Sequence, residues 1–254
     1  MSVWQAIVLG SVQGLTEFLP VSSSGHLLLF EKIFHIDDNL FLTLFLHLGT
    51  LFAVLVVYRK TLWQIIKRPF CDIAKKLYIA SLITICLVCV FKSLIEGSFT
   101  GNFYILGFCI SGFLLILTQI LYSSRKQSSK CLTYKNACLM GFAQGLACVP
   151  GISRSGSTIC AGLLSGCEKN SVADFSFLMS IPIIVASMMY EVIFNNVGAY
   201  SFDILALIVG FIVSFVFGLI AIKFMIKFIK KVSLTYFGIY LFMLSIILTV
   251  VSFL

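Results

Sequence analysis

Six long apolar stretches divide this 254-residue chain and restrict what it can fold into. A helix needs about 20 consecutive apolar residues to cross a hydrocarbon core of roughly 30 Å, and each stretch is close to that length. Because 60% of the residues are hydrophobic, only 11% are charged and the mean hydropathy is +1.08, the composition is that of an integral membrane protein. The stretches cover residues 40–58, 77–95, 103–123, 175–193, 203–222 and 234–253.

Two further regions, 1–36 and 137–170, are apolar but interrupted by Gly, Pro and Ser. They are too broken to be simple spans. Non-helical backbone at membrane depth is tolerated only where it is buried in protein or lines a wet cavity, so these regions are expected to hold a functional site. Since the chain has only four prolines and no low-complexity tract, we expect one compact membrane domain over 1–254.

Basic residues, which give the chain a net charge of +8, are concentrated in three short segments beside the apolar stretches. Segments 59–76, 125–135 and 223–231 hold six, four and four of the 18 Lys and Arg residues. The positive-inside rule assigns these segments to the cytoplasm and the Lys-free segment 194–203 to the outside. This distribution explains the net charge without a nucleic-acid partner.

The two interrupted regions are related to each other. With the sides assigned by charge, region 1–36 enters from the outer face and region 137–170 from the cytoplasmic face, so each returns to its own face and both termini lie outside. Each half then has one hairpin and three spans, and this odd number of crossings inverts the second copy. We predict an all-α polytopic fold with an inverted-topology repeat, 1–123 and 137–254, containing six transmembrane helices and two re-entrant helical hairpins. Seven residue pairs recur at an offset of 131 positions: Gly10/Gly141, Gln13/Gln144, Gly14/Gly145, Leu15/Leu146, Ser22/Ser153, Ser24/Ser155 and Gly25/Gly156.

The second hairpin contains a fixed positive charge, Arg154, within GISRSGST. Gly151 permits a tight turn, and the following STICAGLL is expected to form a short helix. Backbone N–H groups at a helix start, together with the guanidinium fork, suit phosphate oxygens. An Arg that only caps carbonyl groups of the opposite hairpin is the alternative, but the cost of a charge at this depth favours a functional role. Candidate substrate contacts are Ser153, Ser155, Gly156 and Thr158.

The first hairpin supplies an acid, an imidazole and hydroxyl groups. Gln13 and Glu17 lie four residues apart and share one helix face, and Pro20 ends that helix. A carboxylate, His26 and three serines within ten residues match a nucleophile-and-base arrangement. A histidine satisfied by a carbonyl and serines that cap helices are the alternatives. His47 is expected either to make a polar contact between helices or to support the site. The serines are Ser22, Ser23 and Ser24.

At these residues the chain resembles the bacterial undecaprenyl-diphosphate phosphatase family of the bacitracin-resistance type. The first signature is QGLTEFLPVSSSGH (13–26) and the second is PGISRSGST (150–158), while HLGTLFAV (47–54) and FSFLMSIP (175–182) are similar to two further family stretches. The resemblance extends over essentially the whole chain. The family's acidic motif has Glu or Gln at its first position, and Gln13 is the less common of the two.

The resemblance implies a hydrolase that removes the terminal phosphate from a C55 polyprenyl diphosphate. The product is the monophosphate carrier for peptidoglycan synthesis, and the activity confers bacitracin resistance. The resemblance also implies the inverted-repeat fold, a place in the bacterial cell (inner) membrane, and an active site open to the outer, periplasmic face. A divalent cation, Mg²⁺ or Ca²⁺, is the implied cofactor, either catalytic or neutralising the diphosphate.

The resemblance also implies roles for individual residues. Arg154 and the backbone after it hold the phosphate and stabilise charge in the transition state. Glu17 is a base or a metal ligand. The nucleophile is Ser23, His26 or an activated water, with Ser23 and His26 as its base slightly favoured. Gln13 and Gln144, at equivalent positions, are expected to hydrogen-bond across the pseudo-twofold axis. Substrate-binding candidates are thus Gln13, Ser22, Ser24, Gln144, Ser153, Ser155, Gly156 and Thr158.

Two other functions compete with this interpretation. Membrane phosphatases of the phosphatidic-acid type also use SGH and SR motifs, but they need a His six residues after the Arg, and Cys160 occupies that position. A lipid transporter is the competing class, because inverted repeats with broken helices are a transporter architecture. A transporter has no need of Glu17 and His26 beside a row of hydroxyl groups. Membrane lipids are expected around the protein in either case, and a homodimer is left open.

Overall fold

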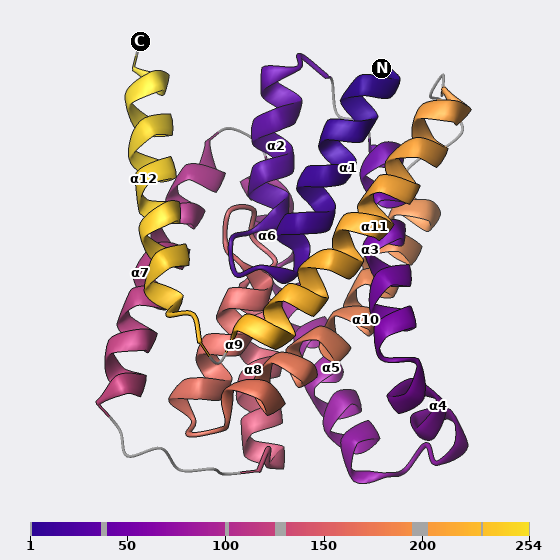
Figure 1. Cartoon of the computed structure of the whole chain (residues 1–254), viewed down its shortest axis with the longest axis vertical. Helices are drawn as coiled ribbons and strands as arrows, with labels where there is room; N and C mark the ends of the chain where they lie inside the picture. The colour runs from indigo at the N-terminus through magenta and orange to yellow at the C-terminus, as the bar shows by residue number, and fades with distance from the viewer. Residues whose placement is uncertain are drawn as a thin grey trace.

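The computed structural model describes residues 2–36, 40–99, 102–124, 131–194, 203–229 and 231–253, and it is all-helical over these residues, with no strand among them. The helices are drawn in Figure 1. Their bounds are α1 Val3–Phe18, α2 Ser23–Ile33, α3 Leu40–Val57, α4 Arg59–Lys67, α5 Asp72–Val90, α6 Lys92–Ser98, α7 Phe103–Ser123, α8 Tyr134–Leu146, α9 Arg154–Leu164, α10 Lys169–Phe194, α11 Ile204–Phe228 and α12 Leu234–Ser252.

Five of the six predicted apolar stretches each correspond to one helix, and 77–95 corresponds to two. Five helices, namely α5, α7, α10, α11 and α12, are long and apolar enough to cross a membrane. Helix α3 adds a sixth if it is taken together with α4, which follows after a bend of 76°. The prediction of an all-α polytopic membrane protein is confirmed. Parts of the segments used for the charge argument, 125–130 and 195–202, lie outside the described residues.

Several predicted helix ends were wrong. The stretch 77–95 is split, because α5 begins at Asp72 and ends at Val90, and a separate short helix starts at Lys92. Helix α10 begins at Lys169 rather than 175, and α11 continues to Phe228 rather than 222. An apolar window finds the residues that suit hydrocarbon, whereas backbone hydrogen bonding continues into polar residues at the helix ends. Because the basic segment 59–76 is not apolar, hydropathy does not predict helix α4, which lies within it.

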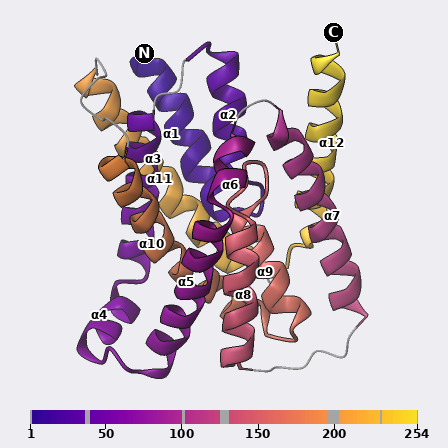
Figure 2. The same cartoon turned by 180° about the vertical axis from the view of Figure 1, so that it is seen from behind.

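The two interrupted regions form two helix pairs, α1 with α2 and α8 with α9. Helix α9 starts at Arg154, three residues before the predicted STICAGLL helix. In Figure 1 the first pair occupies the upper half of the molecule and the second pair the lower half, and Figure 2 shows the same arrangement from behind. Both termini lie at the upper end, opposite α4. The breaks between the paired helices are therefore at mid-height.

Close backbone contacts hold the two breaks together. Gly151 has φ +84, which favours glycine, and a Cβ there would lie 2.2 Å from the carbonyl oxygen of Tyr104. A Cβ on Gly25 would lie 2.9 Å from the Cα of Gly151. The hydroxyl of Ser155 donates to the carbonyl oxygen of Leu19 at 2.9 Å. The tip of the first helix pair thus touches the tip of the second.

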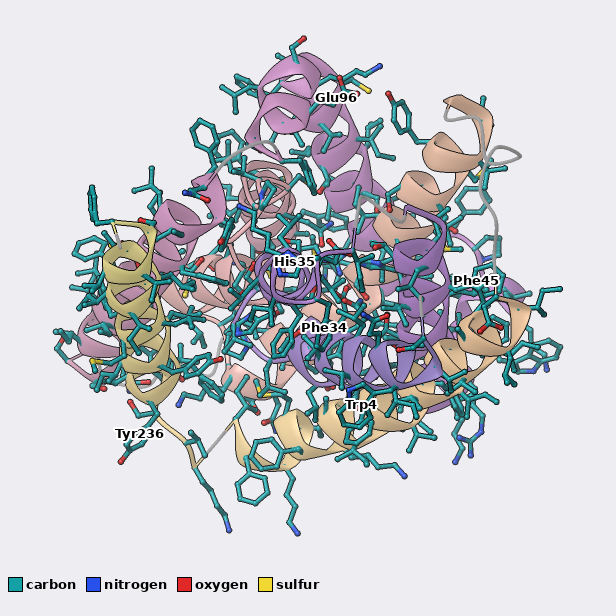
Figure 3. All side chains as sticks on the ribbon, turned by 90° about the horizontal axis from the view of Figure 1, so that it is seen from above. Trp4, Phe34, His35, Phe45, Glu96 and Tyr236 are labelled. Atoms are coloured by element: carbon teal, nitrogen blue, oxygen red, sulfur yellow. The ribbon has the colours of Figure 1, made fainter. Side chains whose placement is uncertain are left out.

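Helices of the first half pack mainly against helices of the second half. Helix α1 packs on α11, α8 packs on α5, and α7 packs on α12. Small residues allow the approach of α1 to α11, since a Cβ on Gly14 would lie 2.7 Å from both the Cβ of Phe217 and the carbonyl oxygen of Ser214. Viewed from above, α12 lies at the edge of the molecule while α1 and α2 lie near its centre (Figure 3).

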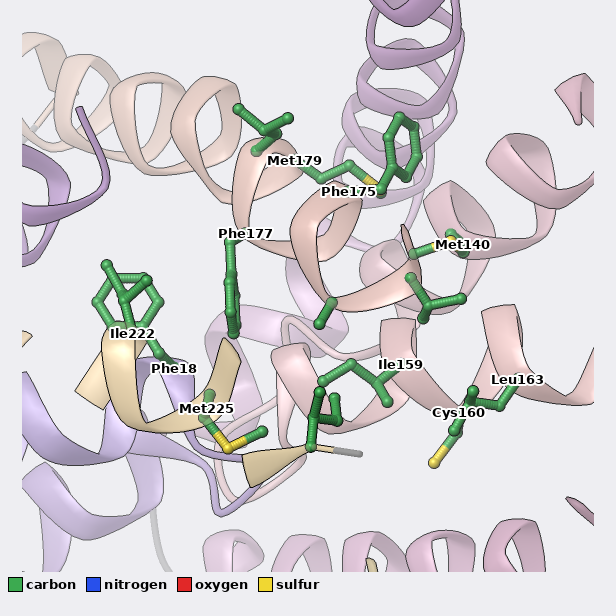
Figure 4. Packing of buried hydrophobic residues seen from close by; sticks show 14 of the residues in the cluster. Phe18, Met140, Ile159, Cys160, Leu163, Phe175, Phe177, Met179, Ile222 and Met225 are labelled. Carbon is green, nitrogen blue, oxygen red and sulfur yellow. The ribbon is translucent and has the colours of Figure 1, made fainter. Parts of the chain in front are cut away.

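The main hydrophobic core surrounds the tips of both helix pairs (Figure 4). The Phe18 ring at the end of α1 meets the Phe177 ring of α10 edge-on, with centroids 5.6 Å apart. Ile159 and Leu163 of α9 are fully buried in the same cluster. Because Phe18 follows Glu17 and Ile159 follows the start of α9, this packing fixes both sides of the polar site.

Candidate functional site

The carboxylate of Glu17 is the centre of the polar site. Glu17 lies in the last turn of α1, and its side chain is only 1% exposed. Its Oε1 accepts a hydrogen bond from the guanidinium of Arg154, which forms an ion pair with it. Its Oε2 accepts from the hydroxyl of Ser23 at 2.5 Å and from Nε2 of Gln13 at 3.0 Å. Three predicted site residues, Arg154, Ser23 and Gln13, are thus hydrogen-bonded to Glu17.

Ser23 and Arg154 occupy equivalent positions in the two helix pairs. They are the first residues of α2 and α9, and they lie 131 positions apart. Two helix N-termini therefore converge on Glu17. Helix N-termini carry a partial positive charge and unpaired N–H groups, which favour an anion. Together with the guanidinium, they make the position of the Glu17 carboxylate suitable for a phosphate group.

Serine caps repeat in the same way at both helix starts. Gly25 N–H donates to the Ser22 hydroxyl at 3.4 Å, and Gly156 N–H donates to the Ser153 hydroxyl at 3.0 Å. Ser24 lies within hydrogen-bond distance of the first cap, 3.5 Å from it. In the second pair, Ser155 lies 3.4 Å from Ser153. These predicted substrate contacts therefore gather at the two tips, where they shape the helix starts.

Both ring nitrogens of His26 have partners other than Ser23. Nδ1 lies 2.8 Å from the Ser22 carbonyl oxygen and Nε2 lies 2.7 Å from the Tyr240 hydroxyl. A carbonyl oxygen only accepts, so Nδ1 carries the hydrogen, and in the neutral form of the ring Nε2 accepts from Tyr240. The favoured pairing of Ser23 with His26 as its base is not formed in this structure. The ring folds back onto a carbonyl one turn earlier, and this directs it toward α12.

The two equivalent glutamines do not bond to each other. Gln13 Nε2 bonds Glu17 and lies 3.5 Å from the Thr50 hydroxyl, while Gln144 Nε2 donates to the Thr84 hydroxyl at 3.2 Å. The expected hydrogen bond across the pseudo-twofold axis is therefore absent. Gln13 of α1 thus lies beside Thr50 of α3, and Gln144 of α8 bonds Thr84 of α5. The Oε1 atom of Gln13 is buried and has no hydrogen-bond partner among the described residues.

The hydroxyl of Thr158 bonds groups inside the protein. Its hydroxyl lies 3.0 Å from the carbonyl oxygens of both Arg154 and Ser155, and 2.6 Å from the hydroxyl of Ser176 on α10. Its side chain is fully buried. The structure thus gives this predicted substrate contact a structural role, in which it ties the first turn of α9 to α10.

His47 lies at the edge of the site. Its Nε2 is 4.0 Å from Oε2 of Glu17, and its Nδ1 is 2.8 Å from the carbonyl oxygen of Thr43. His47 thus makes a contact from α3 to the Glu17 carboxylate on α1, a position compatible with both alternatives for this residue. The structure also adds residues that the sequence did not single out. They are Thr50 beside Gln13, Ser111, whose hydroxyl accepts from Ser153 N–H at 2.8 Å, and Tyr240 beside His26.

The oxygen atoms around Glu17 suit a hard divalent cation only in part. Among the described residues, no group of three or more His, Cys, Asp or Glu side chains is placed to hold a metal ion. The carboxylate of Glu17 and the unpartnered Oε1 of Gln13, whose Nε2 bonds that carboxylate, are two oxygen donors of the site. Mg²⁺ is commonly held by one or two protein oxygens together with substrate phosphates. The residues present therefore fit a cation whose remaining ligands come from a bound diphosphate.

A largely apolar cavity of about 380 Å³ adjoins the site on the α12 side. His26 and Tyr240 line it together with one face of α1 and with Phe30 of α2. The α1 residues are Trp4, Ile7, Val8, Ser11, Val12, Leu15 and Thr16. Such a lining suits hydrocarbon beside the polar group.

The chain matches the family described as bacitracin resistance protein BacA over residues 6–247. The chain belongs to this family. Relatives named undecaprenyl-diphosphatase from Carboxydothermus hydrogenoformans and Christiangramia forsetii are 38% and 36% identical, over 99% and 97% of this chain and 98% and 97% of their own lengths. Undecaprenyl-diphosphatase 3 from Bacillus cereus is 38% identical over 100% of this chain and 98% of its own length. The resemblance seen in the two signatures is confirmed.

Replacing Arg154 with Met should destabilise the fold, because Glu17 would then hold a buried charge without a counter-ion. Loss of one partner of a buried ion pair costs about 3–5 kcal/mol. The midpoint of thermal unfolding in detergent should fall clearly below that of the wild type. The double variant Glu17→Gln with Arg154→Met should recover much of the loss, since no buried charge remains.

Lys92→Met is the matched control. Lys92 and Glu96 lie 3.7 Å apart, and their side chains are 51% and 55% exposed. Exposed pairs contribute about 0–1 kcal/mol, so this variant should unfold close to the wild-type temperature. An Arg154→Met protein as stable as wild type would show that the buried ion pair does not hold the two helix pairs together.

Proposed function

We propose that this chain is an integral membrane phosphatase that hydrolyses undecaprenyl diphosphate to undecaprenyl phosphate and inorganic phosphate. The observation that carries the proposal is the buried Glu17 carboxylate, bonded at once by the Ser23 hydroxyl and the Arg154 guanidinium. Membership of the BacA family and the names of the relatives support it. The activity recycles the lipid carrier for peptidoglycan synthesis and confers bacitracin resistance.

The terminal phosphate of the substrate binds beside Arg154. The guanidinium offers a planar set of donors that matches phosphate oxygens, and the starts of α2 and α9 add N–H groups and partial positive charge. These donors stabilise the charge that spreads over the phosphoryl oxygens in the transition state. The phosphate replaces the Glu17 carboxylate as the partner of Arg154, which leaves Glu17 free to act as a base.

Ser23 is the nucleophile and Glu17 is its base. The 2.5 Å hydrogen bond directs the Ser23 proton to Glu17 Oε2, whereas both nitrogens of His26 are occupied elsewhere. The Ser23 oxygen attacks the terminal phosphorus, the bond to the bridging oxygen breaks, and undecaprenyl phosphate leaves. Water then attacks the phosphoserine, and Glu17 returns its proton to the Ser23 oxygen as inorganic phosphate is released.

Ser23→Ala and Glu17→Gln should each lower kcat by at least about 10³-fold, because nucleophile and base act as one unit. Arg154→Lys keeps the charge but loses the fork, and should lower kcat about 10- to 100-fold. The measurement is phosphate release from undecaprenyl diphosphate by folded protein in detergent. Ser187→Ala is the control, since within the described part of the chain that hydroxyl bonds only the Ile184 carbonyl of its own helix, at 3.0 Å, and it should match the wild type. A folded, metal-replete wild type that releases no phosphate would overturn the proposal and favour lipid transport.

A divalent cation, Mg²⁺ or Ca²⁺, is part of the proposal. One carboxylate oxygen of Glu17 and the Gln13 amide oxygen would hold it, with the other Glu17 oxygen left as the base for Ser23, and it would neutralise the charge of the diphosphate. The same assay after treatment with EDTA should lose most of its activity, and either Mg²⁺ or Ca²⁺ should restore it. Full activity in EDTA would show that Arg154 and the helix starts are sufficient for phosphate binding.

The proposed arrangement in the membrane is an inverted repeat, 1–123 and 137–254, with α1/α2 and α8/α9 as re-entrant hairpins and with both termini and the active site on the periplasmic face of the inner membrane. Equivalent serine caps, equivalent contacts to Glu17, and termini at the end opposite α4 support it. A periplasm-dependent reporter enzyme fused after residue 254 should be active, and the same reporter fused after Lys67 should be inactive. The reverse pattern would invert the proposed orientation.

A further inference from the structure

The turn that presents Ser23 has an unfavourable backbone. Ser22 adopts φ 66 and ψ 95, a left-handed conformation that residues with a Cβ rarely adopt. Such a conformation persists only where the surroundings hold it in place. At the equivalent helix start in the second pair, Ser153 has an ordinary extended backbone, with φ −73 and ψ 111. The Ser22 turn, unlike its counterpart, therefore needs an external restraint.

His26 supplies a restraint on this turn. Its backbone N–H and its ring Nδ1 both bond the carbonyl oxygen of Ser22, at 3.3 Å and 2.8 Å. The ring is buried, with the residue only 4% exposed, and it rests edge-on against Phe108 with centroids 5.1 Å apart. A ring in this orientation holds the peptide group between Ser22 and Ser23 in place.

Tyr240 in turn holds the ring of His26. Its hydroxyl lies 2.7 Å from Nε2, and the two rings stack with centroids 5.8 Å apart and an angle of 10° between their planes. Tyr240 comes from α12, a helix that packs on α7 and not on α1 or α2 to any comparable extent. This contact therefore links the α1/α2 pair to the far end of the chain, 214 positions away.

We propose that Tyr240 is a positioning residue, which holds His26 so that His26 holds the Ser22 turn and keeps the Ser23 hydroxyl directed at Glu17. The inference rests on the proposed function, because it concerns the nucleophile of that reaction. In this inference His26 positions the nucleophile and does not transfer its proton. Ser23 already donates to Glu17, and the one lone pair of the neutral imidazole accepts from Tyr240.

Tyr240→Phe is the first test, since it keeps the stacked ring and removes only the hydroxyl. A lost neutral hydrogen bond should lower kcat about 3- to 10-fold while KM for undecaprenyl diphosphate stays within about twofold, because no phosphate contact changes. Tyr236→Phe is the matched control. Tyr236 lies one turn earlier on α12, is 70% exposed and points away from the molecule (Figure 3), so its loss should leave both constants unchanged.

Substitution of His26 separates the positioning role from a role as base. The amide nitrogen of Asn can take the place of Nδ1 and donate to the Ser22 carbonyl, but an amide cannot act as a base. His26→Asn should therefore keep at least about tenfold more activity than His26→Ala. With Asn at position 26 the partner of the Tyr240 hydroxyl is gone, so adding Tyr240→Phe should cause no further loss. The midpoint of thermal unfolding of every variant shows whether an activity loss reflects unfolding.

Each outcome of these measurements supports or overturns the inference. If His26→Asn is as inactive as His26→Ala although both are folded, His26 is a base and the inference is wrong. If Tyr240→Phe equals wild type, or still lowers kcat in the Asn background, Tyr240 does not act through His26. These results leave the phosphatase proposal standing, which fails only if the folded wild type itself releases no phosphate.

Discussion

The ion pair between Glu17 and Arg154 is the interaction on which the rest of the site depends. Removing a charge from water costs several kcal/mol per ion after relaxation, and a partner with good geometry is needed to offset it. Glu17 is 1% exposed and lies in the last turn of a helix of the first half, while Arg154 begins a helix of the second half. Without a counter-ion, either charge would destabilise the protein at this position. The pair therefore forces the tips of α1/α2 and α8/α9 to meet.

Packing around the ion pair holds the tips of the two helix pairs together. The backbone is closely approached at Gly25 and Gly151, and Ser155 bonds the Leu19 carbonyl across the junction. Phe18, next to Glu17, is fixed by its edge-on contact with Phe177. Because a packed core leaves side chains little freedom, the donors around Glu17 are held in place before a substrate arrives. Preorganised donors of this kind stabilise transition-state charge without reorganisation.

Most of the site could be found from local sequence. The breaks are marked by Pro20 and by the Pro150–Gly151 step. Glu17, Ser23 and Arg154 lie close to these breaks in the sequence. Because the two regions are repeats of each other, the sequence predicts that these three residues share one site, as the structure shows. Helix ends were less accurate, because hydropathy reports only the residues that suit hydrocarbon. The partners of Gln13, Gln144 and His26 could not be found, since Thr50, Thr84 and Tyr240 carry no local signal.

The sequence by itself determined the class of the protein, its membrane helices, the two interrupted regions and the family, because hydropathy, chain breaks and signatures are local properties. Only the tertiary structure decided which polar atoms meet. In the structure Ser23 bonds Glu17 and His26 bonds Tyr240, although Ser23 and His26 lie three positions apart on the same helix. Hydrogen bonds are short and directional, so the choice between two acceptors depends on how helices from distant parts of the chain pack, and sequence spacing does not contain that information.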